Sequence, residues 1–184
     1  MTQPVHAGLD ERLRQLIRDV PDFPEPGVVF KDITPLLADH AAFTEVVSAL
    51  ADAGRDADGT VVVDKVAGME ARGFILAAPV ALALGTGFVP VRKAGKLPGA
   101  THAVSYALEY GEATLEVHRD SIDPGDRVLL VDDVLATGGT ADATRRLVEL
   151  CGGTVHAFAV LMELSFLSGR DAIDGLPLHS LQTV

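Results

Sequence analysis

Two adjacent carboxylates, Asp132 and Asp133, stand directly before a loop of small residues. The glycines of that loop let the backbone approach an anion closely, and its threonine hydroxyls can donate hydrogen bonds. Helical character begins at Ala141, and the free N–H groups of a helix start attract phosphate. The carboxylates would repel a phosphate, so they must face hydroxyl groups or a metal ion. A ribose diol beside a 5′-phosphate satisfies both requirements. The phosphate would be bound by Ala136, Thr137, Gly138, Gly139 and Thr140, and the ribose by Asp132 and Asp133.

An ordinary strand-to-helix turn with two solvated aspartates is the alternative interpretation of this stretch. Two better-known nucleotide motifs do not describe it. The Walker pattern GxxxxGK[ST] is absent from the sequence, and no GxGxxG motif follows a strand.

Two further segments offer positive charge. Arg92, Lys93 and Lys96 form a basic cluster in a chain whose formal net charge is −11. This cluster indicates either a specific anion site or a solvated basic loop. Arg72 lies in a glycine-flanked turn after a predicted strand. Its guanidinium can hold a phosphate with two parallel hydrogen bonds, or it can form a surface salt bridge.

The elements that must position these segments follow from the hydrophobic pattern. We expect strands at 61–68, 87–92, 113–118, 128–131 and 154–162, with helices at 74–84 and 141–150. Strands that alternate with helices predict an α/β fold with a doubly wound, mainly parallel sheet flanked by helices. Such sheets bind ligands beyond the carboxyl ends of their strands. The three candidate segments all follow strands, so they should converge.

The N-terminal third lacks this alternation. Apolar residues at helical spacing predict a helix over 9–20 that ends at Pro21, then an extended segment over 28–33 and a helix over 41–53. We interpret residues 1–58 as an appendage to a core of residues 59–164. Residues 165–184 form a mixed tail with a possible edge strand at 178–181. The whole chain, 1–184, is expected to be a single domain.

Composition excludes several classes of protein. The acidic net charge argues against nucleic acid or an anionic membrane as a partner. No apolar run has the length of a membrane span, and the N-terminus lacks a signal-peptide pattern. With one cysteine, Cys151, no intrachain disulfide is possible, and we expect a cytoplasmic protein. Cys151 is interpreted as a packing residue, with a reactive nucleophile as the alternative. The histidines show no HExxH spacing that would indicate zinc.

The stretch from Val128 to Thr140 resembles the phosphoribosyl-pyrophosphate motif of the type I phosphoribosyltransferases. Within it, the residues Leu-Ala-Thr-Gly-Gly-Thr are most similar to those of the adenine-specific branch of that family. Glu-Ala-Arg-Gly-Phe at 70–74 resembles the pyrophosphate-binding turn of that family. Residues 88–98 are similar to its Pro-x-Arg-Lys-x-Gly-Lys-Leu-Pro segment, and 28–33 to its adenine-contacting segment. The resemblance extends from about Pro21 to Leu164, while the tail from Gly175 matches loosely.

The resemblance implies roles for individual residues. It implies a cis or strained peptide near Glu70-Ala71 and a flexible hood at 94–111 that closes over the site. The alternative for 94–111 is a simple β-excursion with surface tyrosines. Phe30 would stack on adenine, although taken alone it resembles a core residue. The implied pyrophosphate-binding residues are Glu70, Ala71, Arg72, Arg92, Lys93 and Lys96. The implied adenine-binding residues are Val29, Phe30, Lys31 and Val134, the hood residues Tyr106 and Tyr110, and the catalytic residues Glu109, Asp132, Asp133 and Arg72.

The reaction implied is adenine plus phosphoribosyl pyrophosphate giving AMP and pyrophosphate. Mg²⁺ would be held mainly by substrate and water, with Asp132 or Asp133 as candidate protein ligands. The family also implies a homodimer. Two other interpretations stay open, namely a transferase for another base (xanthine, hypoxanthine or orotate) and a regulator that senses phosphoribosyl pyrophosphate while binding nucleic acid. A regulator would need an added basic domain, which this sequence does not contain.

Overall fold

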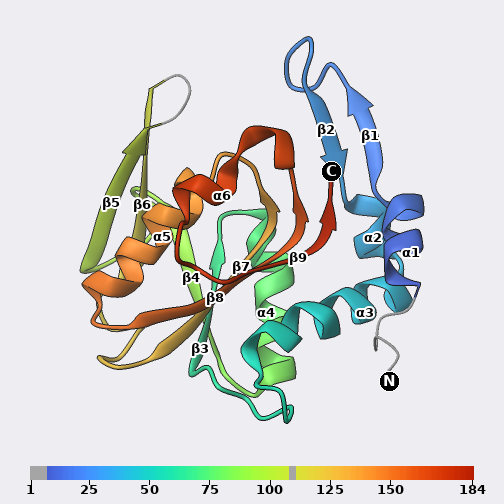
Figure 1. Ribbon diagram of the computed structural model, residues 1–184. Coiled ribbons are helices and arrows are strands. Elements are labelled where there is room, and N and C mark those ends of the chain that lie inside the picture. The colour runs from blue at the N-terminus through green and yellow to red at the C-terminus, as the bar shows by residue number, and fades with distance from the viewer. Residues whose placement is uncertain (1–7, 108–110) are drawn as a thin grey trace. The chain divides into compact units, whose positions relative to one another are not determined.

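The computed structural model describes residues 8–107 and 111–184 (Figure 1). The chain divides into two compact units, one up to Ala49 and one from Leu50 to Val184. Each unit is described by itself below. The helix α3 (His40–Ala51) spans the boundary between them.

The N-terminal unit contains a two-stranded antiparallel ribbon between short helices. Its elements are α1 (Leu9–Leu16), β1 (Arg18–Pro21), β2 (Val29–Asp32), α2 (Thr34–Ala38) and most of α3. The predicted extended segment at 28–33 is confirmed by β2, but the prediction of one helix over 9–20 is wrong beyond Leu16. Val20 pairs with Phe30 across the ribbon. A residue that precedes proline is disfavoured in the helical conformation, so Val20 takes the strand that β2 offers.

The second unit is built on a seven-stranded sheet with the order β5-β6-β4-β3-β7-β8-β9. Its strands are β3 (Lys65–Met69), β4 (Gly87–Lys93), β5 (Thr101–Ala107), β6 (Glu112–His118), β7 (Arg127–Leu135), β8 (Thr154–Glu163) and β9 (Leu178–Thr183). The run from β4 through β3, β7 and β8 to β9 is parallel, while β6 pairs antiparallel with both β4 and β5. The predicted α/β, mainly parallel sheet is confirmed, and so is the strand at the C-terminal edge.

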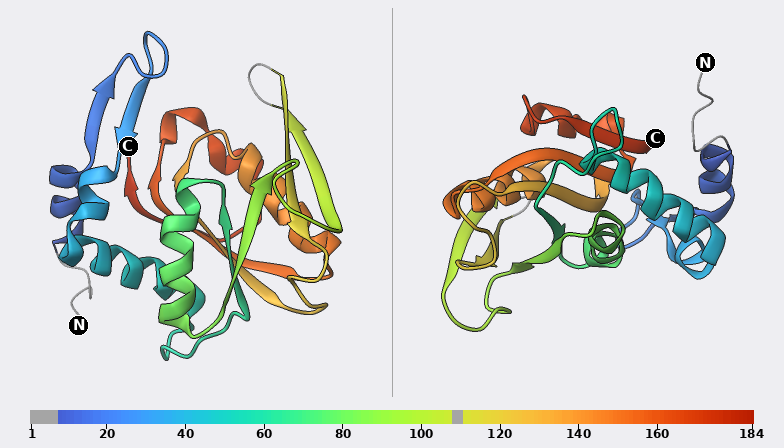
Figure 2. Two further views of the ribbon diagram at one scale, coloured as in Figure 1. Left: turned by 180° about the vertical axis from the view of Figure 1, so that it is seen from behind. Right: turned by 90° about the horizontal axis from the view of Figure 1, so that it is seen from below.

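Helices cover both faces of this sheet. The helix α4 (Arg72–Leu84) lies on one face and α5 (Gly139–Leu150) on the other (Figures 1 and 2). The central strand β7 is therefore buried on both sides, which is why it reads as a continuous apolar run. Val128 and Leu130 pack in the core cluster that contains Leu147 of α5. The alternating residues Leu129 and Val131 are also fully buried and point to the opposite face.

The predicted strand at 61–68 begins too early, and the segment 94–111 contains a strand that only the alternative interpretation of that segment, a β-excursion, allowed for. Residues 61–63 are not part of β3, because Val61 forms only an isolated bridge to Arg55, and the strand begins at Lys65. The predicted excursion at 94–111 contains the full strand β5, which pairs with β6 from Thr101 to Ala107. Its alternation of polar and apolar residues is weak, so the pairing partner rather than the local sequence determines the strand.

Candidate active site

The three segments singled out by their chemistry follow neighbouring strands. The sheet order places β3 between β4 and β7, and Met69 pairs with Val91 while Gly68 pairs with Val131. The turn after β3, the basic cluster after β4 and the loop after β7 consequently lie at one edge of the sheet. This is the carboxyl edge, where ligands of such sheets bind.

The loop after β7 forms an anion seat at the start of α5. Gly138 is the residue before the helix and adopts a φ of 83°, and the first turn closes with Asp142 N–H donating to the Gly138 carbonyl. The backbone N–H groups that precede Asp142 lie ahead of this first hydrogen bond of the helix, so they can donate to a ligand. A cavity of about 140 Å³ lies at this point. It is lined by Asp132, Val134, Leu135, Ala136, Thr137, Gly138, Thr140, Ala141 and Phe158.

Packing excludes a side chain at Gly138 and leaves little room for one at Gly139. A Cβ on Gly138 would lie 2.5 Å from the carbonyl oxygen of Gly169, and one on Gly139 would lie 3.0 Å from Cδ2 of Tyr106. Gly169 opens the short helix α6 (Gly169–Ala172), which thus supports the loop from the C-terminal side. The structure therefore gives two reasons for glycine at these positions: the packing described here and the close approach of a phosphate to the backbone.

The paired aspartates lie in different environments. Asp132 lines the cavity and keeps part of its side chain in contact with solvent, and its Oδ1 accepts a hydrogen bond from Asp133 N at 2.8 Å. Asp133 is 4% exposed, and its Oδ2 lies 2.7 Å from a terminal nitrogen of Arg72. Only Asp132 therefore offers a carboxylate to the cavity, while Asp133 holds the guanidinium.

The pKa of Asp132 is raised well above the usual aspartate value. Burial by the surrounding protein is the main cause, and the neighbouring Asp133 carboxylate adds to it, while the charge of Arg72 acts in the opposite direction. Gly73 permits this arrangement, because a Cβ there would lie 2.8 Å from Asp132 Oδ1 and 3.0 Å from the Val131 carbonyl oxygen. The carboxylate thus packs directly against the N-terminal turn of α4.

Arg72 is the first residue of α4, and its side chain is 35% exposed. The sequence left open whether it binds a phosphate or forms a salt bridge. The structure shows the salt bridge to Asp133, which is internal to the site rather than at a distant surface. The peptide bond between Glu70 and Ala71, just before Arg72, is cis, as the resemblance implied.

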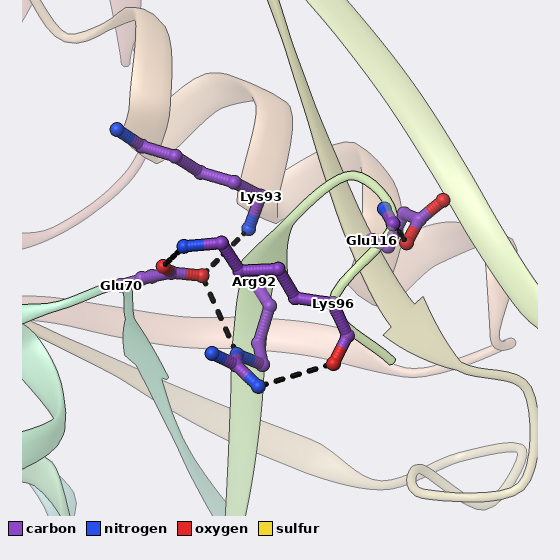
Figure 3. A network of polar contacts seen from close by, with 6 residues as sticks. Glu70, Arg92, Lys93, Lys96 and Glu116 are labelled. Carbon is purple, nitrogen blue, oxygen red and sulfur yellow. Dashed lines mark hydrogen bonds and ion pairs between the residues drawn. The ribbon is translucent and has the colours of Figure 1, made fainter. Parts of the chain in front are cut away.

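Glu70 joins the turn after β3 to the basic cluster (Figure 3). Its carboxylate accepts hydrogen bonds from Lys96 Nζ at 2.6 Å and from the backbone N–H of Lys93 at 2.9 Å, and it pairs with Arg92 Nε at 3.4 Å. The Lys96 ammonium is the main cause that lowers the pKa of Glu70. Glu116 fixes the following turn by accepting from Gly95 N–H. Two of the three cations of the basic cluster thus already have an internal counter-ion in Glu70, as Arg72 has in Asp133.

Lys93 differs from its two basic neighbours. Its side chain extends away from the Glu70 carboxylate (Figure 3). Across the described parts of the chain, Lys93 forms no salt bridge. It is therefore the member of the cluster whose charge is least compensated.

The predicted adenine-contacting residues of the N-terminal unit lie on β2. Val29 is 49% exposed, Phe30 packs edge-on against Phe23 with ring centroids 5.2 Å apart, and Lys31 pairs with Asp19 at 2.7 Å. Val134, the fourth predicted adenine contact, lines the cavity of the second unit.

The hood residues are described in part. Tyr106 lies on β5, and its hydroxyl is 3.1 Å from Oγ1 of Thr140 in the anion loop. Glu109 and Tyr110 lie outside the described residues.

Several contributors to the site could not be found from the sequence. Phe158 lines the cavity because β8 pairs with β7 in a register that places it opposite Leu130. Glu163, which is 5% exposed, receives two hydrogen bonds from Arg170 at 2.6 and 2.7 Å and so holds the chain segment that supports the loop. The spacing of these residues carries no recognisable signal. Cys151 is buried, and burial raises the pKa of its thiol, which favours packing over nucleophilic chemistry.

Within residues 8–107 and 111–184, no group of three histidine, cysteine, aspartate or glutamate side chains could hold a metal ion by itself. In the same residues no helix is long and apolar enough to span a membrane.

Comparison with known proteins agrees with this geometry. A family model described as phosphoribosyl transferase domain matches residues 33–176. The chain is 72% identical over 181 residues to an adenine phosphoribosyltransferase of Nocardioides sp., covering 98% of this chain and 97% of the relative.

Solved structures agree as well. Adenine phosphoribosyltransferase of Saccharomyces cerevisiae, complexed with an imino-altritol bisphosphate and adenine, matches with a TM-score of 0.90 and 38% identity over 95% of this chain and 99% of that one. The Trypanosoma brucei enzyme, in complex with AMP, pyrophosphate and ribose-5-phosphate, matches with a TM-score of 0.86 and 26% identity over 95% and 79%. The chain belongs to the adenine phosphoribosyltransferases, within the phosphoribosyl transferase domain family.

Proposed function

We propose that this chain transfers the 5-phosphoribosyl group from phosphoribosyl pyrophosphate to adenine, giving AMP and pyrophosphate in purine salvage. The observation that carries the proposal is the meeting of the anion loop, the paired carboxylates and the basic cluster at one sheet edge, in a chain of this family. Adenine, AMP, pyrophosphate and ribose-5-phosphate in the yeast and trypanosome structures support the same reaction.

The anion loop would hold the 5′-phosphate of the substrate. Residues 136–140 supply backbone N–H groups at the start of a helix, where the dipole also favours an anion. Asp132 faces the same cavity and can accept hydrogen bonds from the ribose hydroxyls. Its negative charge would also stabilise the positive charge that develops on the ribose as pyrophosphate departs.

The leaving pyrophosphate requires positive charge. Arg92, Lys93 and Lys96 can supply it, with Arg72 adjacent to the ribose side. Glu70 holds two of these cations in the absence of pyrophosphate. Its carboxylate would then compete with the pyrophosphate for these cations and would not itself contact the pyrophosphate, because two anions would repel each other.

The site offers Mg²⁺ one protein carboxylate, so most of its other ligands would be substrate oxygens and water. Magnesium prefers oxygen ligands and keeps several waters, and it is often bound by one or two carboxylates together with substrate phosphates. Asp132 offers such a carboxylate to the cavity, whereas Asp133 is engaged by Arg72. When bound, Mg²⁺ would neutralise charge on the departing pyrophosphate.

Adenine would be bound by Val29, Phe30, Lys31 and Val134, with Phe30 stacking on the ring. Glu109 is the candidate for assisting proton movement at the base, a role worth about 10²- to 10⁴-fold in rate. The hood at 94–111 would exclude water from the activated ribose. Homodimerisation and a cytoplasmic location also remain predictions.

The test is product formation from phosphoribosyl pyrophosphate and Mg²⁺ with adenine, hypoxanthine, guanine, xanthine or orotate in turn. We expect AMP from adenine alone, and its loss in Asp132→Asn/Asp133→Asn. Turnover of an oxo-purine or orotate would contradict the assignment of residues 29–31 to adenine. Tight binding of phosphoribosyl pyrophosphate without turnover of any base would indicate a sensor instead of an enzyme.

A further inference from the structure

A hydrogen bond joins the strand β5 to the anion loop. The Tyr106 hydroxyl lies 3.1 Å from Thr140 Oγ1, and this contact is partly buried. The Tyr106 ring lies over the loop so closely that a Cβ at Gly139 would be 3.0 Å from its Cδ2 atom. The tyrosine therefore packs its ring against Gly139 and hydrogen-bonds through its hydroxyl to the next residue, Thr140. Thr140 also lines the cavity, so it connects the tyrosine to the ligand side of the loop.

The direction of this hydrogen bond matters for anion binding. Each hydroxyl carries one proton, and either oxygen can be the donor at this distance. If Thr140 donated to Tyr106, its oxygen would turn lone pairs toward an arriving phosphate. If Tyr106 donates, the Thr140 proton is left for the phosphate. A phosphate monoester near neutral pH is largely dianionic and chiefly accepts hydrogen bonds, so only the second arrangement is favourable.

We propose that Tyr106 is a positioning residue for 5′-phosphate binding, whose hydroxyl donates to Thr140 and thereby directs the Thr140 proton to the phosphate. This inference rests on the proposed assignment of the loop to the 5′-phosphate. A chain of two hydrogen bonds that ends on an anion is strengthened by mutual polarisation. The tyrosine thus contributes to phosphate affinity without touching the ligand.

The proposal is tested by binding of ribose-5-phosphate, measured calorimetrically, in Tyr106→Phe. The variant keeps the ring against Gly139 and removes only the donor. We expect the dissociation constant to rise about 3- to 10-fold, as for loss of one hydrogen bond. Inorganic pyrophosphate, which lacks the 5′-phosphate, should bind as before. In steady-state kinetics the KM for phosphoribosyl pyrophosphate should rise while kcat is maintained, because the interaction exists in the ground state and the transition state alike.

Variants of Thr140 separate positioning from a general structural effect. Thr140→Val should weaken ribose-5-phosphate binding at least as much as Tyr106→Phe, and the double variant should be no weaker than Thr140→Val alone. Thr140→Ser keeps the hydroxyl and should retain wild-type affinity. Thr114→Val removes another hydroxyl pair, the 2.8 Å contact with Ser105 on β5 and β6, and should have no effect.

The outcomes are distinct. Unchanged ribose-5-phosphate affinity in Tyr106→Phe, or effects of Tyr106→Phe and Thr140→Val that multiply, would overturn the positioning role. Equal weakening of ribose-5-phosphate and pyrophosphate would also overturn it, because it would indicate general loss of structure. If the wild-type protein binds neither ribose-5-phosphate nor phosphoribosyl pyrophosphate, the proposed function itself fails.

Discussion

At the scale of residues, the charged groups of the site are already paired with one another. Asp133 holds Arg72, and Glu70 holds Lys96 and Arg92. A pyrophosphate must therefore compete with a carboxylate for the cations that would bind it. If pyrophosphate binds here as proposed, this competition should limit how tightly it is retained and so favour its release.

Glu70→Gln should make pyrophosphate a stronger product inhibitor. The amide removes the competing charge but can still accept the hydrogen bond from the Lys93 N–H group. We expect the inhibition constant of pyrophosphate to fall about 3- to 10-fold, in line with the loss of one charge-assisted competitor. Glu116→Gln is the matched control, because Glu116 accepts from Gly95 N–H and should leave the inhibition constant unchanged. Weaker inhibition in Glu70→Gln would show that the carboxylate is needed to organise the cations.

Asp132 should reduce the stability of the folded protein at neutral pH. A carboxyl group whose pKa is raised on folding contributes stability below its unfolded pKa, and that contribution is lost as the pH rises through the folded pKa. Asp132→Asn should therefore raise the free energy of unfolding at pH 7.5, and the gain should disappear at a pH below the ordinary aspartate value of 3.8. Denaturant titrations at both pH values, without ligand or metal, measure this difference. A variant that is less stable than wild type at pH 7.5 would contradict the raised pKa.

At the scale of elements, the sequence predicted those whose pattern is local. The central strands and the helices α4 and α5 were identified because buried runs and helical periodicity are visible in the residues themselves. β1 was missed as a strand, and β5 was foreseen only in the alternative of a β-excursion, because each strand is specified by its pairing with a neighbouring segment, β2 or β6, and not by its own residue pattern. Phe158 could not be predicted either, because its place in the cavity depends on the register in which β8 pairs with β7.

The start of α4 is the element that fixes Asp132. Gly73→Ala should favour the helix by up to about 1 kcal/mol, since alanine is the better helix former. The new Cβ, however, would lie 2.8 Å from Asp132 Oδ1, so the carboxylate must move. We expect kcat/KM for phosphoribosyl pyrophosphate to fall on the order of 10- to 100-fold, as small displacements in active sites do.

Gly87→Ala is the control for this substitution. Its Cβ would meet Lys65 Cδ at 3.4 Å, an ordinary contact in β4 away from the cavity, and activity should be retained. Activity of Gly73→Ala within twofold of wild type would show that the position of Asp132 is not critical.

At the scale of the whole molecule, an acidic chain concentrates its site cations at one edge of the sheet. With a formal net charge of −11, the protein repels anions in general, and the local cluster at 92–96 supplies the attraction. The sequence predicted the three segments and their convergence, because parallel strands share a carboxyl edge. It could not predict the salt bridges from Glu70, since these depend on which strands are neighbours in the sheet.

The most direct test of a single phosphoribosyl-pyrophosphate site at this edge is a calorimetric titration of that compound, with Mg²⁺, into wild type and Asp132→Asn/Asp133→Asn. We predict one molecule bound per chain by the wild type. Affinity should fall about 100-fold or more in the double variant, because the carboxylate that Asp132 offers to the ribose and the salt bridge by which Asp133 holds Arg72 are both lost. Wild-type affinity in the double variant would contradict the assignment of the paired aspartates to the ribose and, with it, the proposed site.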